Sequence, residues 1–212
     1  MSEAAAPDAT TTRLEAFSDG VLAIAITLLI IEVKVPDVGS GDLARALWDQ
    51  WPSYAAYVVS FVVIGIMWVN HHAIFEQIRT VDRGLLFVNL MLLLGIAFLP
   101  FPTALLAEYL REGGANATTA AVVYSTTMVF IGSAFLALQL YLRAHTSLAV
   151  ATYSRERADA AVRRTVIGPI AYAATIPLAF VSAPACLVVY ALIAAFFAAS
   201  SIRLPRRAPA AS

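Results

Sequence analysis

Residues 13–31 read RLEAFSDGVLAIAITLLII, a short charged segment followed directly by an apolar run. Within residues 21–31 the only polar side chain is that of Thr27, and the carboxylate of Asp19 stands just before this run. A helix that crosses a bilayer needs about 20 mostly apolar residues to span roughly 30 Å of hydrocarbon. The stretch therefore predicts a membrane helix with a polar entry.

The composition of the whole chain supports a membrane protein. Of its 212 residues, 60% are hydrophobic and 13% are charged, and the mean hydropathy is +0.78, which lies outside the range of soluble domains. The net charge is zero, so no basic field exists to hold nucleic acid, and nucleic acid is excluded as a main partner. The single cysteine, Cys186, can form neither an intrachain disulfide nor a cysteine metal site. Without the pattern of a cleavable signal peptide, we expect the first apolar segment to stay in the mature protein.

Six largely apolar stretches are long enough to be considered as spans. They cover approximately residues 16–31, 52–75, 84–107, 117–142, 165–181 and 185–202. We therefore predict an all-α membrane protein with six transmembrane helices. Residues 13–202 would form this membrane domain, and residues 1–12 and 203–212 would be loose cytoplasmic tails.

The distribution of basic residues predicts the orientation. For six spans, eleven arginines fall on the side of the termini and three basic residues on the other side. The positive-inside rule then places both termini in the cytoplasm. Thirteen arginines against one lysine, with abundant alanine, are typical of a GC-rich bacterial genome, so we expect a multi-pass protein of the prokaryotic plasma membrane.

The second apolar stretch ends in a polar cluster formed by Trp68, Asn70, His71 and His72. If the first two helices are antiparallel, this cluster lies at the depth of the polar entry. Asn and His side chains within a span need hydrogen-bond partners. The nearest candidates in the entry are Arg13, Ser18 and Asp19. We predict a network that links the first two helices.

Simpler interpretations stay open at this stage. Asp19 could simply cap the first helix, and His71 and His72 could reach toward the interface as neutral imidazoles. A metal site from His72 and Glu76 would supply only half of a zinc shell, so we predict no resident metal.

One face of the first helix is defined by spacings of three and four residues. It carries Gly20, Ile24, Thr27, Leu28 and Ile31. From periodicity alone, such a face is more typical of a packed helix seam than of a pore wall. In a seam, the Thr27 hydroxyl would bond to a carbonyl one turn earlier.

Two motifs together resemble a known family. The polar entry contains Arg13-x-x-x-Phe17-Ser18-Asp19-Gly20. The second stretch contains Trp68-x-Asn70-His71-His72. They resemble the potassium channels typified by the endolysosomal potassium channel and its shorter prokaryotic homologues. The entry motif is fairly specific, because an Asp between Ser and Gly at a membrane boundary is unusual.

The resemblance implies a central pore lined by the first helices, without the usual potassium filter loop. No Thr-Val-Gly-Tyr-Gly stretch occurs in this sequence. By position, Ile24 would form the hydrophobic constriction, Leu28 and Ile31 would continue the apolar wall, and Thr27 would contribute to cation selectivity. The motif residues would hold the pore helix in place. The entry motif occurs once, where the animal members carry two repeats, so a homotetramer is expected.

The function expected from the resemblance is passive, potassium-preferring permeation of monovalent cations, without a cofactor. The alternative is a secondary transporter or proton-coupled carrier that uses Asp19 and the histidines as a relay. No inverted repeat with broken helices supports that alternative. An enzyme is not expected, because the spans contain no HExxH motif and no nucleophile with an evident base.

Overall fold

A computed structural model describes residues 9–39 and 41–202. The predicted tail at residues 203–212 and residues 1–8 of the N-terminal tail lie outside the described residues, while residues 9–12 form the first turn of a helix. The helices in chain order are α1 (Ala9–Leu28), η1 (Leu29–Glu32), α2 (Leu43–Asp49), α3 (Trp51–Phe75), α4 (Arg83–Phe98), α5 (Pro100–Tyr109), α6 (Gly114–Ala144), η2 (Thr146–Leu148), α7 (Arg155–Ala179) and α8 (Ala183–Ile202).

The prediction of six spans is wrong. Within the described residues, four segments are long and apolar enough to cross a membrane: Thr10–Glu32, Trp51–Phe75, Arg83–Tyr109 and Gly114–Ala144. They coincide with the first four predicted stretches. The third combines α4 and α5, which meet at Leu99, before Pro100 and Pro102 begin the second helix.

The last two predicted stretches are not long and apolar enough to count as candidate spans, for two physical reasons. The first part of α7 is highly charged, with Arg155, Glu156, Arg157, Asp159, Arg163 and Arg164. The apolar part of α8, Ala183–Ala199, is a shorter helix. The corrected description is an all-α membrane protein with four candidate spans, with α7 and α8 packed beside them.

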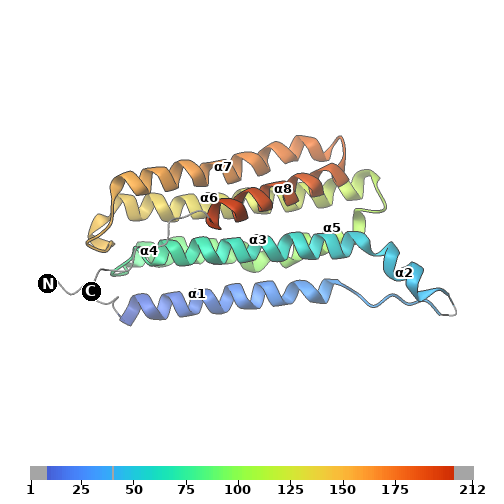
Figure 1. The fold of residues 1–212 in the computed structure, drawn as a ribbon, viewed down its shortest axis with the longest axis horizontal. Helices are drawn as coiled ribbons and strands as arrows, with labels where there is room; N and C mark the ends of the chain where they lie inside the picture. Colours follow the sequence, from blue (N-terminus) through green and yellow to red (C-terminus); the bar gives the residue numbers. More distant parts are fainter. Residues whose placement is uncertain (1–8, 40, 203–212) are drawn as a thin grey trace.

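The long helices run side by side in an elongated bundle (Figure 1). In this view α1 lies at one side of the bundle and α7 at the opposite side, with α3, α6 and α8 between them. α1 packs on α3 and α4, while α7 packs on α6 and α8.

Two glycines allow close packing in the interior of the bundle. A Cβ added at Gly95 of α4 would lie 2.7 Å from Ile131 Cγ1 of α6. A Cβ added at Gly132 of α6 would lie 2.9 Å from Pro169 Cδ of α7. Small residues at such positions let helix backbones approach closely, which is the main source of packing energy between apolar helices in a membrane.

Arginines gather at one end of the bundle, which we call the arginine-rich end; it contains the α3–α4 loop and the α6–α7 loop. The two loops are joined by hydrogen bonds from the Arg79 N–H to the Leu148 carbonyl (2.8 Å) and from the Val150 N–H to the Gln77 carbonyl (3.0 Å). The Thr11 hydroxyl donates to the Arg79 carbonyl at 3.0 Å and so attaches the start of α1 to the same loops.

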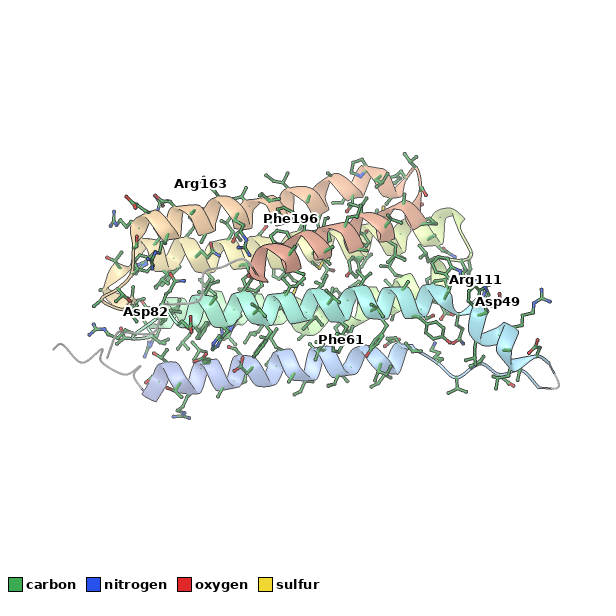
Figure 2. The ribbon with its side chains drawn as sticks, viewed as in Figure 1. Asp49, Phe61, Asp82, Arg111, Arg163 and Phe196 are labelled. Atoms are coloured by element: carbon green, nitrogen blue, oxygen red, sulfur yellow. The ribbon has the colours of Figure 1, made fainter. Side chains whose placement is uncertain are left out.

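Asp82 caps α4 at the arginine-rich end. Its Oδ1 accepts from the Leu85 N–H at 2.8 Å, and its Oδ2 accepts from the Tyr141 hydroxyl at 2.9 Å. The Leu85 hydrogen bond is the main reason that the pKa of Asp82 lies below its usual value. Figure 2 shows Asp82 at this end, and Asp49 and Arg111 at the opposite end. There the Arg111 guanidinium donates to the Asp49 carbonyl at 2.7 Å.

Candidate functional site

The face of α1 predicted to line a pore is exposed in the single chain. Ile24 is 61% exposed, Leu28 41% and Ile31 65%. An added Cβ at Gly20 would meet no atom within 4 Å. The opposite face of α1 is buried against the bundle and consists of Thr11, Leu14, Ser18, Leu22 and Ala25, and Leu29 of η1 continues it. α1 is therefore covered on one side only, and the predicted pore residues occupy the other side.

Thr27 is the polar member of the exposed face. Its hydroxyl donates to the carbonyls of Ala23 and Ile24, both at 2.9 Å. Since the proton is used by the helix backbone, the hydroxyl oxygen keeps lone pairs that can face a cation. One residue later the α-helix ends at Leu28 and continues as the 3₁₀ helix η1, which contains Ile31.

Two hydrogen bonds join α1 to α3 near the arginine-rich end. The Trp68 indole N–H donates to Asp19 Oδ1 at 3.0 Å. One turn further along α3, His72 Nδ1 lies 3.1 Å from Glu15 Oε1. The rings of Trp68 and His72 stack with their centroids 6.1 Å apart. These contacts are exposed, and they form the rim of the α1–α3 contact.

A second, fully buried chain of hydrogen bonds joins α3, α4 and α1. His71 Nε2 donates to Asn89 Oδ1 at 3.0 Å, and Asn89 Nδ2 donates to Ser18 Oγ at 2.9 Å. Ser18 in turn donates to the Leu14 carbonyl at 2.9 Å. His71, Asn89 and Ser18 have no exposed surface. The His71 ring stacks on Phe75 with centroids 4.2 Å apart.

The structure places the remaining motif residues outside these two hydrogen-bonded groups. Arg13 is exposed on α1, and Phe17 is 54% exposed. Asn70 lines a cavity between α3, α6 and α7. Across the described part of the chain, no three His, Cys, Asp or Glu side chains gather closely enough to hold a metal ion.

Sequence reasoning missed Glu15 and Asn89. Glu15 belongs to the polar entry and lies one turn before Asp19. Because the two residues share a face of the helix, their spacing could have indicated that Glu15 also faces the second helix. Asn89 lies in α4, beyond the two helices that carry the motifs. Its own signal was the presence of a single amide within the apolar stretch 84–107, since such a group needs a partner inside the membrane.

Long apolar helices that pack through a few buried hydrogen bonds define an integral membrane protein built as an α-helical bundle. The comparisons with known proteins specify its family. Residues 13–100 match the family model described as Endosomal/lysosomal potassium channel TMEM175. These residues cover most of α1 and all of α3 and α4, which contribute the side chains of the rim contact and of the buried His71–Asn89–Ser18 chain.

Relatives match over nearly the whole chain. The chain is 50% identical over 200 residues to a protein of Streptomyces collinus named a potassium channel, which covers 94% of this chain and 97% of that protein. It is 40% identical over 194 residues to a protein of Chamaesiphon minutus named a potassium channel, over 90% of this chain and 95% of that one.

A solved structure agrees with these matches. The crystal structure titled as a lysosomal potassium-selective channel TMEM175 homolog from Chamaesiphon minutus has a TM-score of 0.82 and 40% identity, and it covers 92% of this chain and 99% of that chain. The chain belongs to the TMEM175 family. The resemblance seen in the two motifs is thereby confirmed.

Proposed function

We propose that this protein is a potassium-preferring cation channel. The observation that carries the proposal is the exposed face of α1 and η1, on which Ile24, Leu28 and Ile31 lie together with Thr27. Support comes from relatives that are named potassium channels and match almost the full length of the chain. The permeant ions would be K⁺ and other monovalent cations, and the protein would lie in a prokaryotic plasma membrane.

A pore requires several copies of the chain, because one helix cannot enclose a path. Closed ring symmetry is the usual arrangement of such copies. We infer a homotetramer in which four α1 helices turn their exposed faces toward a common axis. This arrangement would bury the apolar face of Ile24, Leu28 and Ile31, which the single chain leaves uncovered.

The chemistry of the face suggests how permeation would be controlled. A ring of Ile24 side chains offers no oxygen to replace the hydration shell of an ion. It would therefore act as a size and dewetting barrier, and an ion would pass only when the ring is wide enough to keep water. The Thr27 hydroxyls, about one turn away, would supply the nearest oxygens and favour cations.

The motif residues would have a supporting role. The Trp68–Asp19 contact and the buried His71–Asn89–Ser18 chain attach α1 to α3 and α4. They use the face of α1 opposite Ile24, so they would orient the pore helix without binding ions.

The test is a bi-ionic current measurement on purified protein in liposomes, with potassium on one side and sodium on the other. For the wild type we expect a potassium-biased reversal potential. Ile24→Asn should increase the current severalfold and reduce the bias, because an amide ring stays wet. The control is Ile170→Asn, the same substitution at a residue of α7 that is 63% exposed on the other side of the bundle.

The outcomes separate the candidate functions. Unaltered currents in a well-folded Ile24→Asn protein would remove Ile24 from the pore. Saturable flux that requires counter-transport, with no measurable conductance, would favour the secondary transporter or proton-coupled carrier.

A further inference from the structure

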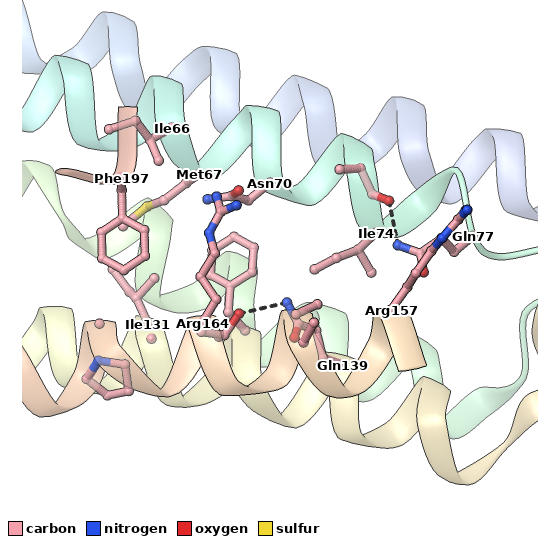
Figure 3. A pocket seen from close by; sticks show the side chains of 18 of the residues that line it. Ile66, Met67, Asn70, Ile74, Gln77, Ile131, Gln139, Arg157, Arg164 and Phe197 are labelled. Atoms are coloured by element: carbon pink, nitrogen blue, oxygen red, sulfur yellow. Dashed lines mark hydrogen bonds between the residues drawn. The ribbon is translucent and has the colours of Figure 1, made fainter. Parts of the chain in front are cut away.

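A large cavity lies between α3, α6, α7 and α8, on the side of α3 away from α1. Its volume is about 870 Å³, within the range of sites that hold small organic ligands. Figure 3 shows its lining, with Arg157 and Arg164 reaching across from α7 toward Gln77 and Asn70 of α3. The site on α1 uses none of these residues.

The cavity is elongated along the helices. Its lining on α3 extends from Glu76, at the end of the candidate span, to Val63 inside it. With a rise of 1.5 Å per residue, this interval is about 20 Å long. Since the hydrocarbon core is about 30 Å thick, the cavity reaches from a membrane boundary past the midplane.

The polarity of the lining changes along this axis. At the boundary, the cavity is lined by Arg157, Glu76 and Gln77, and Arg157 is exposed. Arg164 lies seven residues, about 10 Å, deeper along α7. The inner end is apolar and is lined by Ile66, Met67, Ile131 and Phe197. A membrane lipid has the same gradient, with a charged headgroup at the boundary and a hydrocarbon chain inside.

The charge of the cavity favours an anion. Arg157 and Arg164 line it against one carboxylate, that of Glu76. Arginine binds phosphate groups well, because its planar guanidinium presents several donors in a fixed geometry. The boundary half of the cavity therefore suits a phosphate more than a neutral or cationic group.

A third feature is the side chain of Gln139 in α6, which lies between Arg164 and Arg157 along the cavity (Figure 3). Its Nε2 donates to the Thr165 hydroxyl at 2.8 Å. Its Oε1 is buried and accepts no hydrogen bond within the described part of the chain. A buried acceptor is costly unless a donor reaches it, and a hydroxyl of a bound headgroup would be such a donor.

We propose that this cavity binds an anionic phospholipid of the membrane, with its phosphate between Arg157 and Arg164 and one acyl chain against Met67, Ile131 and Phe197. A headgroup with hydroxyls, as in phosphatidylglycerol, would also donate to Gln139. The site is separate from the exposed face of α1, and its occupancy does not depend on whether that face conducts ions.

The experiment is native mass spectrometry of the full-length protein titrated with phosphatidylglycerol or with phosphatidylcholine of identical chains. We expect tighter binding of phosphatidylglycerol, and a loss of about fivefold in affinity for Arg157→Gln or Arg164→Gln. The matched control is Arg163→Gln, because Arg163 is an exposed neighbour on α7 that points away from the bundle (Figure 2). Its binding should equal that of the wild type.

A second variant blocks the cavity at the level of the headgroup without removing charge. Ala161 also lines the cavity, and Ala161→Phe should fill it and weaken binding while both arginines remain. A phosphatidylglycerol with a photoreactive group at the end of its chain should label residues 63–67 of α3 in the wild type but not in Ala161→Phe.

Three results would overturn the proposal. The first is equal binding of the two lipids, and the second is equal weakening by Arg163→Gln, which would indicate general surface attraction. The third is complete competition by inorganic phosphate, which would indicate a site for a free anion. The Arg157→Gln and Ala161→Phe proteins keep the test decisive if Arg164→Gln does not fold.

Discussion

α1 and α6 are both apolar enough to cross a membrane, but the bundle covers them differently. In the most apolar part of the α1 span 28% of the residues are buried, against 50% in α6. α6 packs on α4, α5 and α7, whereas α1 packs on α3 and α4 with one face. Helices of similar hydropathy therefore have different roles: α6 completes the fold of the single chain, while α1 leaves a face for contacts beyond it.

The two helices also differ in how closely their backbones pack. α6 and α7 pack closely where Gly132 meets the Pro169 ring, and hydrogen bonds from Gln139 to Thr165 and between Ser125 and Thr175 also join them. α1 has open space at Gly20, and it is held by buried side chains such as Leu22 together with two polar contacts, the buried chain through Asn89 and the rim contact of Trp68 with Asp19. Because apolar helices gain little from leaving lipid, specific polar contacts of this kind give α1 a defined orientation.

The largest loss of stability is expected at the α6–α7 contact. Gly132→Val would force a side chain into the Pro169 ring and the backbone nitrogen of that residue, neither of which can move easily. We expect destabilisation of about 1–3 kcal/mol, measured as reduced resistance to thermal unfolding in detergent. The counterpart on α1 is Gly20→Ala, which meets no atom within 4 Å and should not lower the stability of the single chain. If Gly132→Val and Gly20→Ala lost equal stability, α6 and α1 would not differ in how tightly the bundle covers them.

An intermediate effect is expected in the buried hydrogen-bond chain. Asn89→Leu leaves the Nε2–H of His71 without its acceptor and breaks the connection to Ser18. We expect a cost of about 1–2 kcal/mol, with faster hydrogen exchange confined to α1. Asn70→Leu is the control at similar depth on the cavity side of α3. If the amides of α1 exchange as slowly in Asn89→Leu as in the wild type, the buried hydrogen-bond chain does not hold the helix in place.

The smallest effect is expected for Asp82, whose carboxylate caps α4. Its lowered pKa means that the charged form is favoured by folding, mainly through the Leu85 N–H. This contribution is present above the unfolded-state pKa of about 4 and is lost as the pH falls through the lower folded-state value. Asn caps helices about as well as Asp, so Asp82→Asn should differ slightly from the wild type at about pH 6. The difference should shrink at about pH 3. A pH-independent difference in thermal unfolding would contradict this interpretation.

The motif on α3 shows how far sequence reasoning could reach. Trp68 and His72 are four residues apart and share a face, and both contact α1. Asn70 and His71 are turned from that face by the 100° step of the helix, so His71 meets α4 while Asn70 faces the cavity. Periodicity alone could have separated Asn70 from the network, but it could not supply Asn89, because the partner of His71 depends on which helix packs there.

The sequence by itself determined the class of protein and the first four apolar segments, because these follow from composition and helix length, and its two motifs indicated the family. Only the tertiary structure decided which side of α1 is covered, that Ser18 and His71 meet through Asn89, and that α3 and α7 enclose a cavity lined by arginines. These features depend on how helices rotate and pack against one another. A hydropathy pattern records how apolar a helix is, but the neighbours it meets depend on side-chain shape and hydrogen bonds over long separations in the chain.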